Sequence, residues 1–247
     1  NEVLFIRQAA YAEMYPNETA GYRGRAKRYG GTATMVVLDG RTGKEKTSFP
    51  IPAPADDTFA FADLTGRGRR EDFVIKDLCE NLYGVSRDGE FLWQWHGGPW
   101  PVAGHNKSRA PKVSVIDKKG ELGHYPAIMD IDGDGRDEVF FGFTLLDHDG
   151  RVLFREDAPL INQQGGRAHS DANYIVRLAD GAWRLLFGNH GVHCLAADGT
   201  ELWHRPLPFD EAQHVVAGRF RADSQLQVAV IDRGFPRTKD GATACLY

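Results

Sequence analysis

The stretch Asp130-Ile131-Asp132-Gly133-Asp134-Gly135-Arg136-Asp137-Glu138 decides how the rest of the chain is interpreted. It places carboxylates at alternate positions of a short, glycine-containing loop and ends on a further carboxylate at the ninth position. This pattern is typical of a Ca²⁺ loop, because hard cations prefer oxygen ligands and glycine permits the sharp turn that brings them together. The predicted ligands are Asp130, Asp132, Asp134, the Arg136 carbonyl and Glu138.

The surroundings of this loop separate it from an EF-hand. An EF-hand carries a bidentate glutamate at its twelfth position, and here that position is Phe141. The loop also runs directly into the apolar stretch Val139-Phe140-Phe141, so we expect it to join two strands. The alternative is an acidic turn whose glycines only shape a hairpin.

An Asp-Gly turn followed by a short strand recurs along the chain, and apolar, strand-like runs precede each copy. Four short strands per unit of about 45 residues, with Gly and Asp turns and little helical periodicity, are typical of a propeller. The sequence therefore predicts an all-β fold, a β-propeller of four-stranded blades with about five blade equivalents. The turns are Asp39-Gly40, Asp88-Gly89, Asp149-Gly150, Asp198-Gly199 and Asp240-Gly241.

A degenerate copy of the acidic loop begins at Asp63 and is aligned so that Glu71 matches Glu138. It carries Arg67 where an aspartate is expected, so we predict that it closes without metal and that arginine takes part of the cation's space. Residues 1–5 superpose on residues 137–141, which predicts that the chain starts within a blade. We expect one propeller domain over 1–247, part of a larger ring, with inserted loops at about 8–30 and 97–122.

Composition excludes several classes of function. A net charge of −4 gives no case for nucleic-acid binding, and no apolar run is long enough to span a membrane. The three cysteines are widely spaced and form neither a metal-binding spacing nor a disulfide framework. The two insertions are rich in aromatic and basic residues, which suit sugar faces and carboxylates, so the expected partner is an acidic glycan. We expect a monomer.

Several motifs together resemble the bacterial rhamnogalacturonan lyases. They are Gly123-His124-Tyr125 with the following acidic loop, His169-Ser170-Asp171-Ala172, and Thr42-Gly43-Lys44-Glu45. The resemblance implies a polysaccharide lyase with structural Ca²⁺, acting outside the cytoplasm in the extracellular space or the periplasm. Ser170 replaces a glycine of the family pattern, and a related lyase for another glycan of rhamnose and uronate fits the sequence equally well.

Propeller geometry then selects candidate site residues, because residues that enter the innermost strand and residues that leave the second strand gather on one face. The catalytic candidates are His124, His169 and His190. The substrate-binding candidates are Arg7, Arg23, Arg25, Lys76, Tyr125, Asn189, His214 and Arg233. Any one histidine could instead be a structural side chain, and any one arginine could belong to a solvated basic loop.

These residue types suit β-elimination from a uronate. The reaction needs a cation to neutralise the carboxylate and a base that titrates near neutral pH, as imidazole does. Hydrolysis by paired carboxylates is less favoured because acidic residues at the predicted face are sparse. The alternative class is a non-catalytic, calcium-binding propeller that binds glycans or mediates adhesion. A quinone-dependent dehydrogenase fits poorly, because no tryptophan-docking motif recurs beyond Trp93 and Trp203.

Overall fold

The structure is a computed structural model that describes residues 2–8, 33–55, 58–77, 81–96, 123–155, 170–189, 191–205, 212–222, 226–232 and 243–246. All regular secondary structure in these ranges is β-strand, which confirms the all-β prediction. Within the same ranges, no helix has the length and apolar character needed to cross a membrane.

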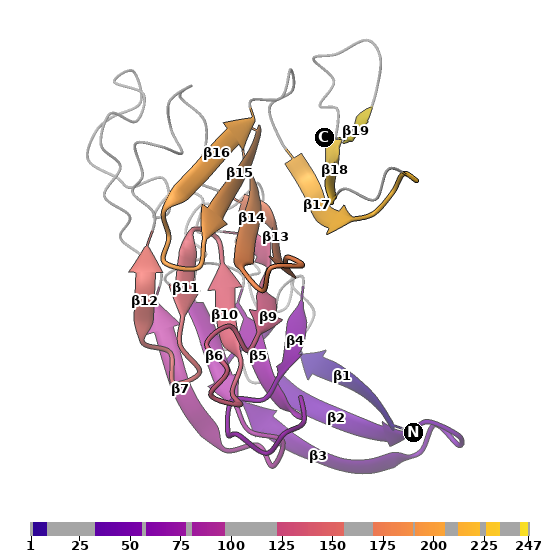
Figure 1. Cartoon of the computed structure of the whole chain (residues 1–247). Coiled ribbons are helices and arrows are strands. Elements are labelled where there is room, and N and C mark those ends of the chain that lie inside the picture. Colours follow the sequence, from indigo (N-terminus) through magenta and orange to yellow (C-terminus); the bar gives the residue numbers. More distant parts are fainter. Residues whose placement is uncertain are drawn as a thin grey trace, which may run out of the picture.

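The strands form five sheets, numbered here in chain order (Figure 1). Sheet 1 holds β1 (Glu2–Gln8), β2 (Ala33–Asp39) and β3 (Glu45–Ile51). Sheet 2 holds β4 (Phe59–Ala62), β5 (Asp72–Lys76), β6 (Asn81–Val85) and β7 (Phe91–His96). Sheet 3 holds β9 (Ala127–Met129), β10 (Glu138–Phe141), β11 (Thr144–Leu146) and β12 (Val152–Arg155). Sheet 4 holds β8 (Gly123–Tyr125), β13 (Ser170–Arg177), β14 (Trp183–Asn189), β15 (Gly191–Ala196) and β16 (Glu201–Arg205). Sheet 5 holds β17 (Ala212–Gly218), β18 (Gln227–Asp232) and β19 (Thr243–Leu246).

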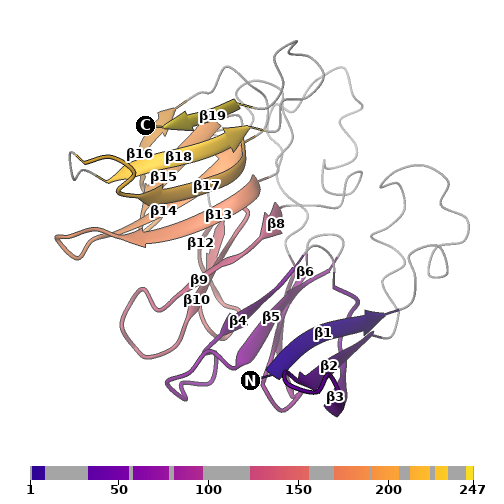
Figure 2. The same ribbon diagram turned by 90° about the vertical axis from the view of Figure 1, so that its right-hand side faces the viewer.

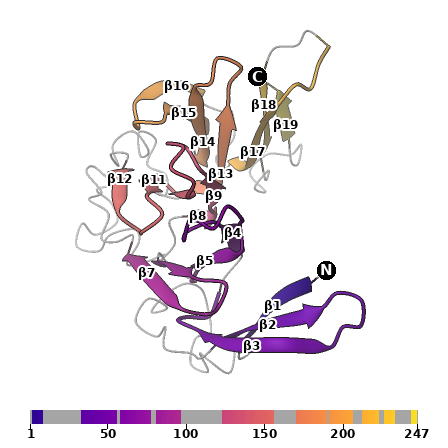
Figure 3. The same ribbon diagram turned by 60° about the horizontal axis from the view of Figure 1, so that its bottom comes forward.

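The five sheets follow one another along an open arc, with sheets 1 and 5 at its two ends (Figure 3). Within each sheet, strands that follow one another in the chain pair antiparallel. The exception is β8, which pairs parallel with β13 at the edge of sheet 4 (Figure 2). The pairing of β8, which carries His124 and Tyr125, with sheet 4 was not predicted from the sequence.

A register shift at the same place in four sheets shows that the sheets are copies of one unit. It lies between Val37 and Leu38, Gly84 and Val85, Leu145 and Leu146, and Cys194 and Leu195. Each shift lies just before the turn to the last strand of its sheet, which supports the predicted repeat for the turns at Asp88, Asp149 and Asp198. In sheet 1 the shift places Asp39 at the position of Ser86, and the turn glycine is Gly43, so Asp39-Gly40 is not an equivalent copy. The fifth turn, Asp240-Gly241, lies outside the described residues, between the second and third strands of sheet 5, so it is not an equivalent copy.

The second strands of sheets 2 and 3 are buried along their whole length. All residues of β5 and β10 are buried, whereas β7 alternates between buried and more exposed residues. A strand covered on both faces favours a continuous apolar run, and this explains Phe73-Val74-Ile75 and Val139-Phe140-Phe141. The resulting core connects sheets 2, 3 and 4 through residues such as Leu82, Phe140 and Phe187.

Aromatic rings from the last strand of one sheet pack on a turn glycine of the next. Phe49 lies over Gly89, Trp93 over Gly150 and Phe154 over Gly199, each so close that a Cβ added to the glycine would stand within 3.0 Å of the ring. All three glycines have positive φ, which L-residues with a side chain rarely adopt. The turn glycines therefore shape the turns and also make room for packing between sheets.

Sheets 2 and 3 are also joined by a polar clamp, defined here as Arg70, Asp137 and the backbone of Asp63. Arg70 donates Nε to Asp137 Oδ2 at 2.9 Å and Nη2 to Oδ1 at 2.8 Å. The Asp63 amide donates to Asp137 Oδ2 at 2.7 Å, and the Asp137 amide donates to the Asp63 carbonyl at 2.9 Å. Asp137 is buried, so its negative charge depends on these donors.

Replacing Arg70 by methionine is therefore expected to lower the free energy of unfolding by about 2 kcal/mol, because it strips a buried carboxylate of its cation. Urea denaturation measures this value. Arg69→Met is the matched control, since the Arg69 side chain is 78% exposed and its guanidinium lies 3.9 Å from Glu71 Oε1. Equal stability of the two variants would contradict the clamp.

Candidate functional site

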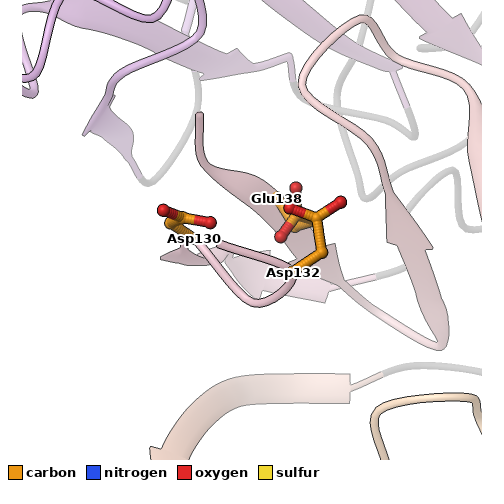
Figure 4. A group of neighbouring side chains, drawn as sticks. All are labelled: Asp130, Asp132 and Glu138. Carbon is orange, nitrogen blue, oxygen red and sulfur yellow. The ribbon is translucent and has the colours of Figure 1, made fainter. Parts of the chain in front are cut away.

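The loop between β9 and β10 brings three carboxylates together. Oxygen atoms of Asp130, Asp132 and Glu138 lie within 4.8 Å of one another, and this is the only cluster of this kind among the described residues (Figure 4). Asp130 and Asp132 come from the loop, and Glu138 is the first residue of β10. An acidic cluster that could hold a metal ion is thus present where the sequence predicts it.

Backbone hydrogen bonds fix the shape of this acidic loop, residues 130–138. The amides of Gly133 and Gly135 donate to the two oxygens of Asp130 at 2.7 and 3.2 Å. Both glycines have positive φ, which allows the chain to fold back on the carboxylate. The amide of Asp134 donates to Asp132 Oδ1 at 3.0 Å. The loop itself therefore holds the carboxylates of Asp130 and Asp132 in place.

Glu138 supplies the test of whether a cation fits. Its side chain is 1% exposed, and Oε2 accepts a hydrogen bond from the Ile131 amide at 2.6 Å. Its other oxygen, Oε1, is buried without a hydrogen-bond partner among the described residues. The pKa of Glu138 is raised to about 7, chiefly by burial; the neighbouring charges of Asp132 and Asp147 contribute to the rise, and the hydrogen bond from the Ile131 amide opposes it. A bound cation would supply the missing partner of Oε1 and would offset the repulsion between the neighbouring carboxylates.

The two other predicted ligands lie differently. Asp134 does not belong to the cluster of three: its Oδ1 accepts from the Arg136 amide at 2.8 Å, and its Oδ2 lies 3.9 Å from His148 Nδ1. The Arg136 guanidinium turns away toward His148, with 2.7 Å between Nη1 and Nε2. The structure thus groups three of the four predicted side-chain ligands, and the part of Asp134 and the Arg136 carbonyl stays a prediction.

The degenerate copy in sheet 2, residues 63–72, closes by hydrogen bonds. Asp63 accepts from the amides of Arg67 and Arg69 at 2.8 and 2.9 Å. Asp72 accepts from the Leu64 and Thr65 amides, both at 3.0 Å. The expectation that arginine fills the cation's place is wrong, because backbone amides meet the carboxylates while the Arg67 guanidinium pairs with Asp88 at 3.3 Å.

The alignment of Glu71 with Glu138 is also wrong, by one residue. Asp72 pairs with Ala62 in sheet 2, and Glu138 pairs with Met129 in sheet 3. Asp72, and not Glu71, is therefore the equivalent of Glu138. The loop of sheet 2 is thus one residue longer than the loop of sheet 3. The residue that follows β5 at the position equivalent to Arg7 is therefore Asp77. Lys76 instead lies in the completely buried strand β5.

Asp77 takes the position that was assigned to Lys76 from the sequence. It is fully buried and accepts from the Asn81 amide at 3.1 Å, from Asn81 Nδ2 at 2.5 Å and from the Tyr83 hydroxyl at 3.3 Å. Asn81 Oδ1 in turn contacts His96 Nδ1. The length of the loop before β5 is the only sequence signal that could have revealed this shift.

Three predicted residues lie close together between sheets 4 and 5. His124 and Tyr125 lie on β8, with ring centroids 6.2 Å apart, and the Tyr125 ring lies 5.9 Å from that of His214 on β17. Arg7 lies near the end of β1, exposed, with Nη1 3.5 Å from Glu45 Oε2. Asn189 ends β14. The remaining candidates lie outside the described residues: His169, His190, Arg23, Arg25 and Arg233.

Comparison with known proteins places this geometry in context. No family model matches the chain. Its sequence is 24% identical over 176 residues, 67% of the chain, to the rhamnogalacturonan endolyase YesW of Bacillus subtilis (strain 168). The chain spans 26% of the length of that enzyme.

Solved structures of rhamnogalacturonan lyases are also similar to the chain. The crystal structure of YesW matches over 93% of the chain and 41% of that structure, at 21% identity and a TM-score of 0.56. The exotype rhamnogalacturonan lyase YesX matches over 97% and 41%, at 19% identity and a TM-score of 0.57. The chain has a rhamnogalacturonan lyase-like fold. The V. cholerae biofilm matrix protein Bap1 also matches, over 98% of the chain and 37% of Bap1, at 15% identity and a TM-score of 0.58.

Proposed function

We propose that this chain is part of a polysaccharide lyase that cleaves an acidic glycan of rhamnose and uronate, similar to rhamnogalacturonan, by β-elimination. The observation that carries the proposal is the sequence similarity to YesW over two thirds of the chain. The fold shared with YesW and YesX agrees with it. A lyase for such a glycan would work where the polymer is found, in the extracellular space or the periplasm, and we expect the chain to act as a monomer.

The proposal includes a β-propeller architecture and a structural Ca²⁺. Support for the propeller comes from the five successive sheets, the register shift that four of them share and their order along the arc (Figure 3). Support for Ca²⁺ comes from the cluster of Asp130, Asp132 and Glu138 and from the orphaned Glu138 oxygen. These residues would hold the ion within a hairpin of sheet 3, where it would stabilise the loop.

The elimination assigns distinct tasks to the chain's own residues. A base removes the proton at C5 of the uronate, the bond from C4 to the glycosidic oxygen breaks, a C4–C5 double bond forms, and an acid returns a proton to the leaving oxygen. The proposed base is one of His124, His169 and His190. Arg7 is a proposed partner of the uronate carboxylate, with Arg23 or Arg25 as alternatives, because a cation that neutralises the carboxylate makes the C5 proton more acidic. Lys76 is not proposed for this task, because it is completely buried in β5. Tyr125, Asn189, His214 and Arg233 would hold the sugars.

The second candidate is a non-catalytic glycan-binding or adhesion module. The observation that favours it is the similarity to Bap1, which is named for a biofilm matrix and not for a reaction. Such a module would keep the acidic cluster and the exposed aromatic residues but would leave its ligand uncut.

Incubation with rhamnogalacturonan separates the two candidates. A lyase is expected to generate ultraviolet absorbance from the unsaturated uronate at each new non-reducing end, and a binding module is not. Homogalacturonan and a neutral galactan serve as substrate controls. Binding of rhamnogalacturonan without any unsaturated product, at high protein concentration and over a long incubation, would favour the module.

A further inference from the structure

Two aromatic rings from distant parts of the chain lie side by side and exposed. Tyr125 is 42% exposed on β8, and His214 is exposed on β17. Their ring centroids are 5.9 Å apart and their planes are inclined by 32°. Aromatic rings present flat apolar faces, so an exposed pair on neighbouring sheets offers a surface on which a ligand can stack.

The strand that carries Tyr125 is held closely against sheet 4. Gly123 and Tyr125 pair with Ser170 and Ala172 of β13. A Cβ on Gly123 would stand 2.5 Å from the Ser170 carbonyl oxygen, so only glycine permits this approach. Ser170 is fully buried and donates its hydroxyl to the Ala172 carbonyl at 3.1 Å. The backbone below Tyr125 is therefore fixed, while its ring remains open to a ligand.

The spacing of the rings determines how a ligand could lie on them. A sugar ring inserted between two aromatic faces needs about 7–8 Å, which is two carbon–carbon contacts of about 3.5–4 Å. The 5.9 Å between Tyr125 and His214 is too short for this. A sugar can instead lie on the exposed side of the rings, with its C–H face against them.

From this geometry we infer that Tyr125 and His214 form a stacking subsite for the neutral, deoxy sugar of the glycan, and not for its uronate. The inference rests on the proposed function and adds a location for the neutral residue. Ring faces favour C–H-rich, uncharged surfaces, and a 6-deoxyhexose such as rhamnose offers a methyl group in addition. Carboxylates bind more favourably to guanidinium groups such as that of Arg7.

Calorimetric titration with a rhamnogalacturonan hexasaccharide tests the subsite, at low temperature and with the ligand checked for intactness by mass spectrometry. Tyr125→Ala is expected to raise the Kd about tenfold, and Tyr125→Phe less than about twofold, because only the ring matters. The loss should be the same at low and high salt, whereas the loss in Arg7→Ala should shrink as salt screens the charge. Phe91→Ala, which removes a 53% exposed ring on β7, is the matched control.

The outcomes separate the subsite from the proposed function. If the parent protein binds the hexasaccharide and Tyr125→Ala binds it within twofold of the parent while retaining its melting temperature, the subsite is overturned and the lyase proposal stands. An equal loss in Phe91→Ala would also overturn the subsite. If the parent binds no hexasaccharide, the proposed function fails and the subsite fails with it.

Discussion

Alanine in place of the catalytic base is expected to reduce turnover of rhamnogalacturonan by about 10²–10⁴-fold, while binding of the glycan stays largely intact. The variants to compare are His124→Ala, His169→Ala and His190→Ala. The base acts as the C5 proton leaves, so its loss raises the barrier without removing a contact of the bound ground state. Initial rates and calorimetric titration measure the two effects separately.

Arg7→Ala should behave differently, with a loss in both binding and turnover. A cation that neutralises the uronate carboxylate contacts it in the ground state, and the contact tightens as negative charge develops during proton removal. His204→Ala serves as a histidine control, because that ring stacks on His193 at 4.0 Å within sheet 4. Unchanged turnover in all three candidate variants would contradict a histidine base.

Removal of Ca²⁺ is expected to lower the melting temperature. Extracellular Ca²⁺ sites commonly have a Kd of about 10⁻⁴–10⁻³ M. A free Ca²⁺ concentration roughly thirtyfold above the Kd would stabilise the folded state by about 2 kcal/mol. For a chain of this size, that corresponds to about 4–8 °C in melting temperature relative to a chelator. Differential scanning fluorimetry with Ca²⁺, with Mg²⁺ and with chelator provides the measurement.

This stabilisation should depend on pH through Glu138. Burial raises its pKa from 4.5 to about 7 in the metal-free folded state. Between these two values the folded state holds a proton that the unfolded chain has lost, so the stability contributed by Glu138 falls as pH rises through this window. Ca²⁺ removes the penalty because it binds the ionised form. The gain from Ca²⁺ should therefore be larger at about pH 8 than at about pH 5.5.

Glu138→Gln separates this effect from other carboxylates. It should lose most of the gain from Ca²⁺ and should also flatten the pH dependence of the chelated protein, because the amide does not titrate. Identical melting temperatures with Ca²⁺ and with chelator at both pH values would mean that the acidic loop holds no ion.

Local chemistry made part of this structure predictable. The acidic loop forms where its carboxylates and glycines predict, because the hydrogen bonds from backbone amides to Asp130, Asp132 and Asp134 all lie within the loop. The turns at Asp88, Asp149 and Asp198 were also predictable, since a glycine of positive φ follows each aspartate. The buried strands β5 and β10 were predictable from their continuous apolar runs, because a strand that is covered on both faces favours apolar residues throughout.

Long-range features were not predictable from one sequence. One additional residue in the loop before β5 moves Asp77 into the place assigned to Lys76, and only strand pairing reveals the shift. The parallel pairing of β8 with β13 depends on how closely Gly123 approaches Ser170. The contact between Tyr125 and His214 joins sheets 4 and 5, so neither residue alone indicates it.

The mass of the cleavage products tests β-elimination most directly. When a rhamnogalacturonan oligosaccharide of defined length is incubated with the protein, elimination adds no water, so the masses of the two fragments sum to that of the substrate. One fragment should carry the unsaturated uronate. Fragments whose summed mass exceeds that of the substrate by one water would show hydrolysis and contradict the lyase proposal, as would recovery of the intact substrate after prolonged incubation.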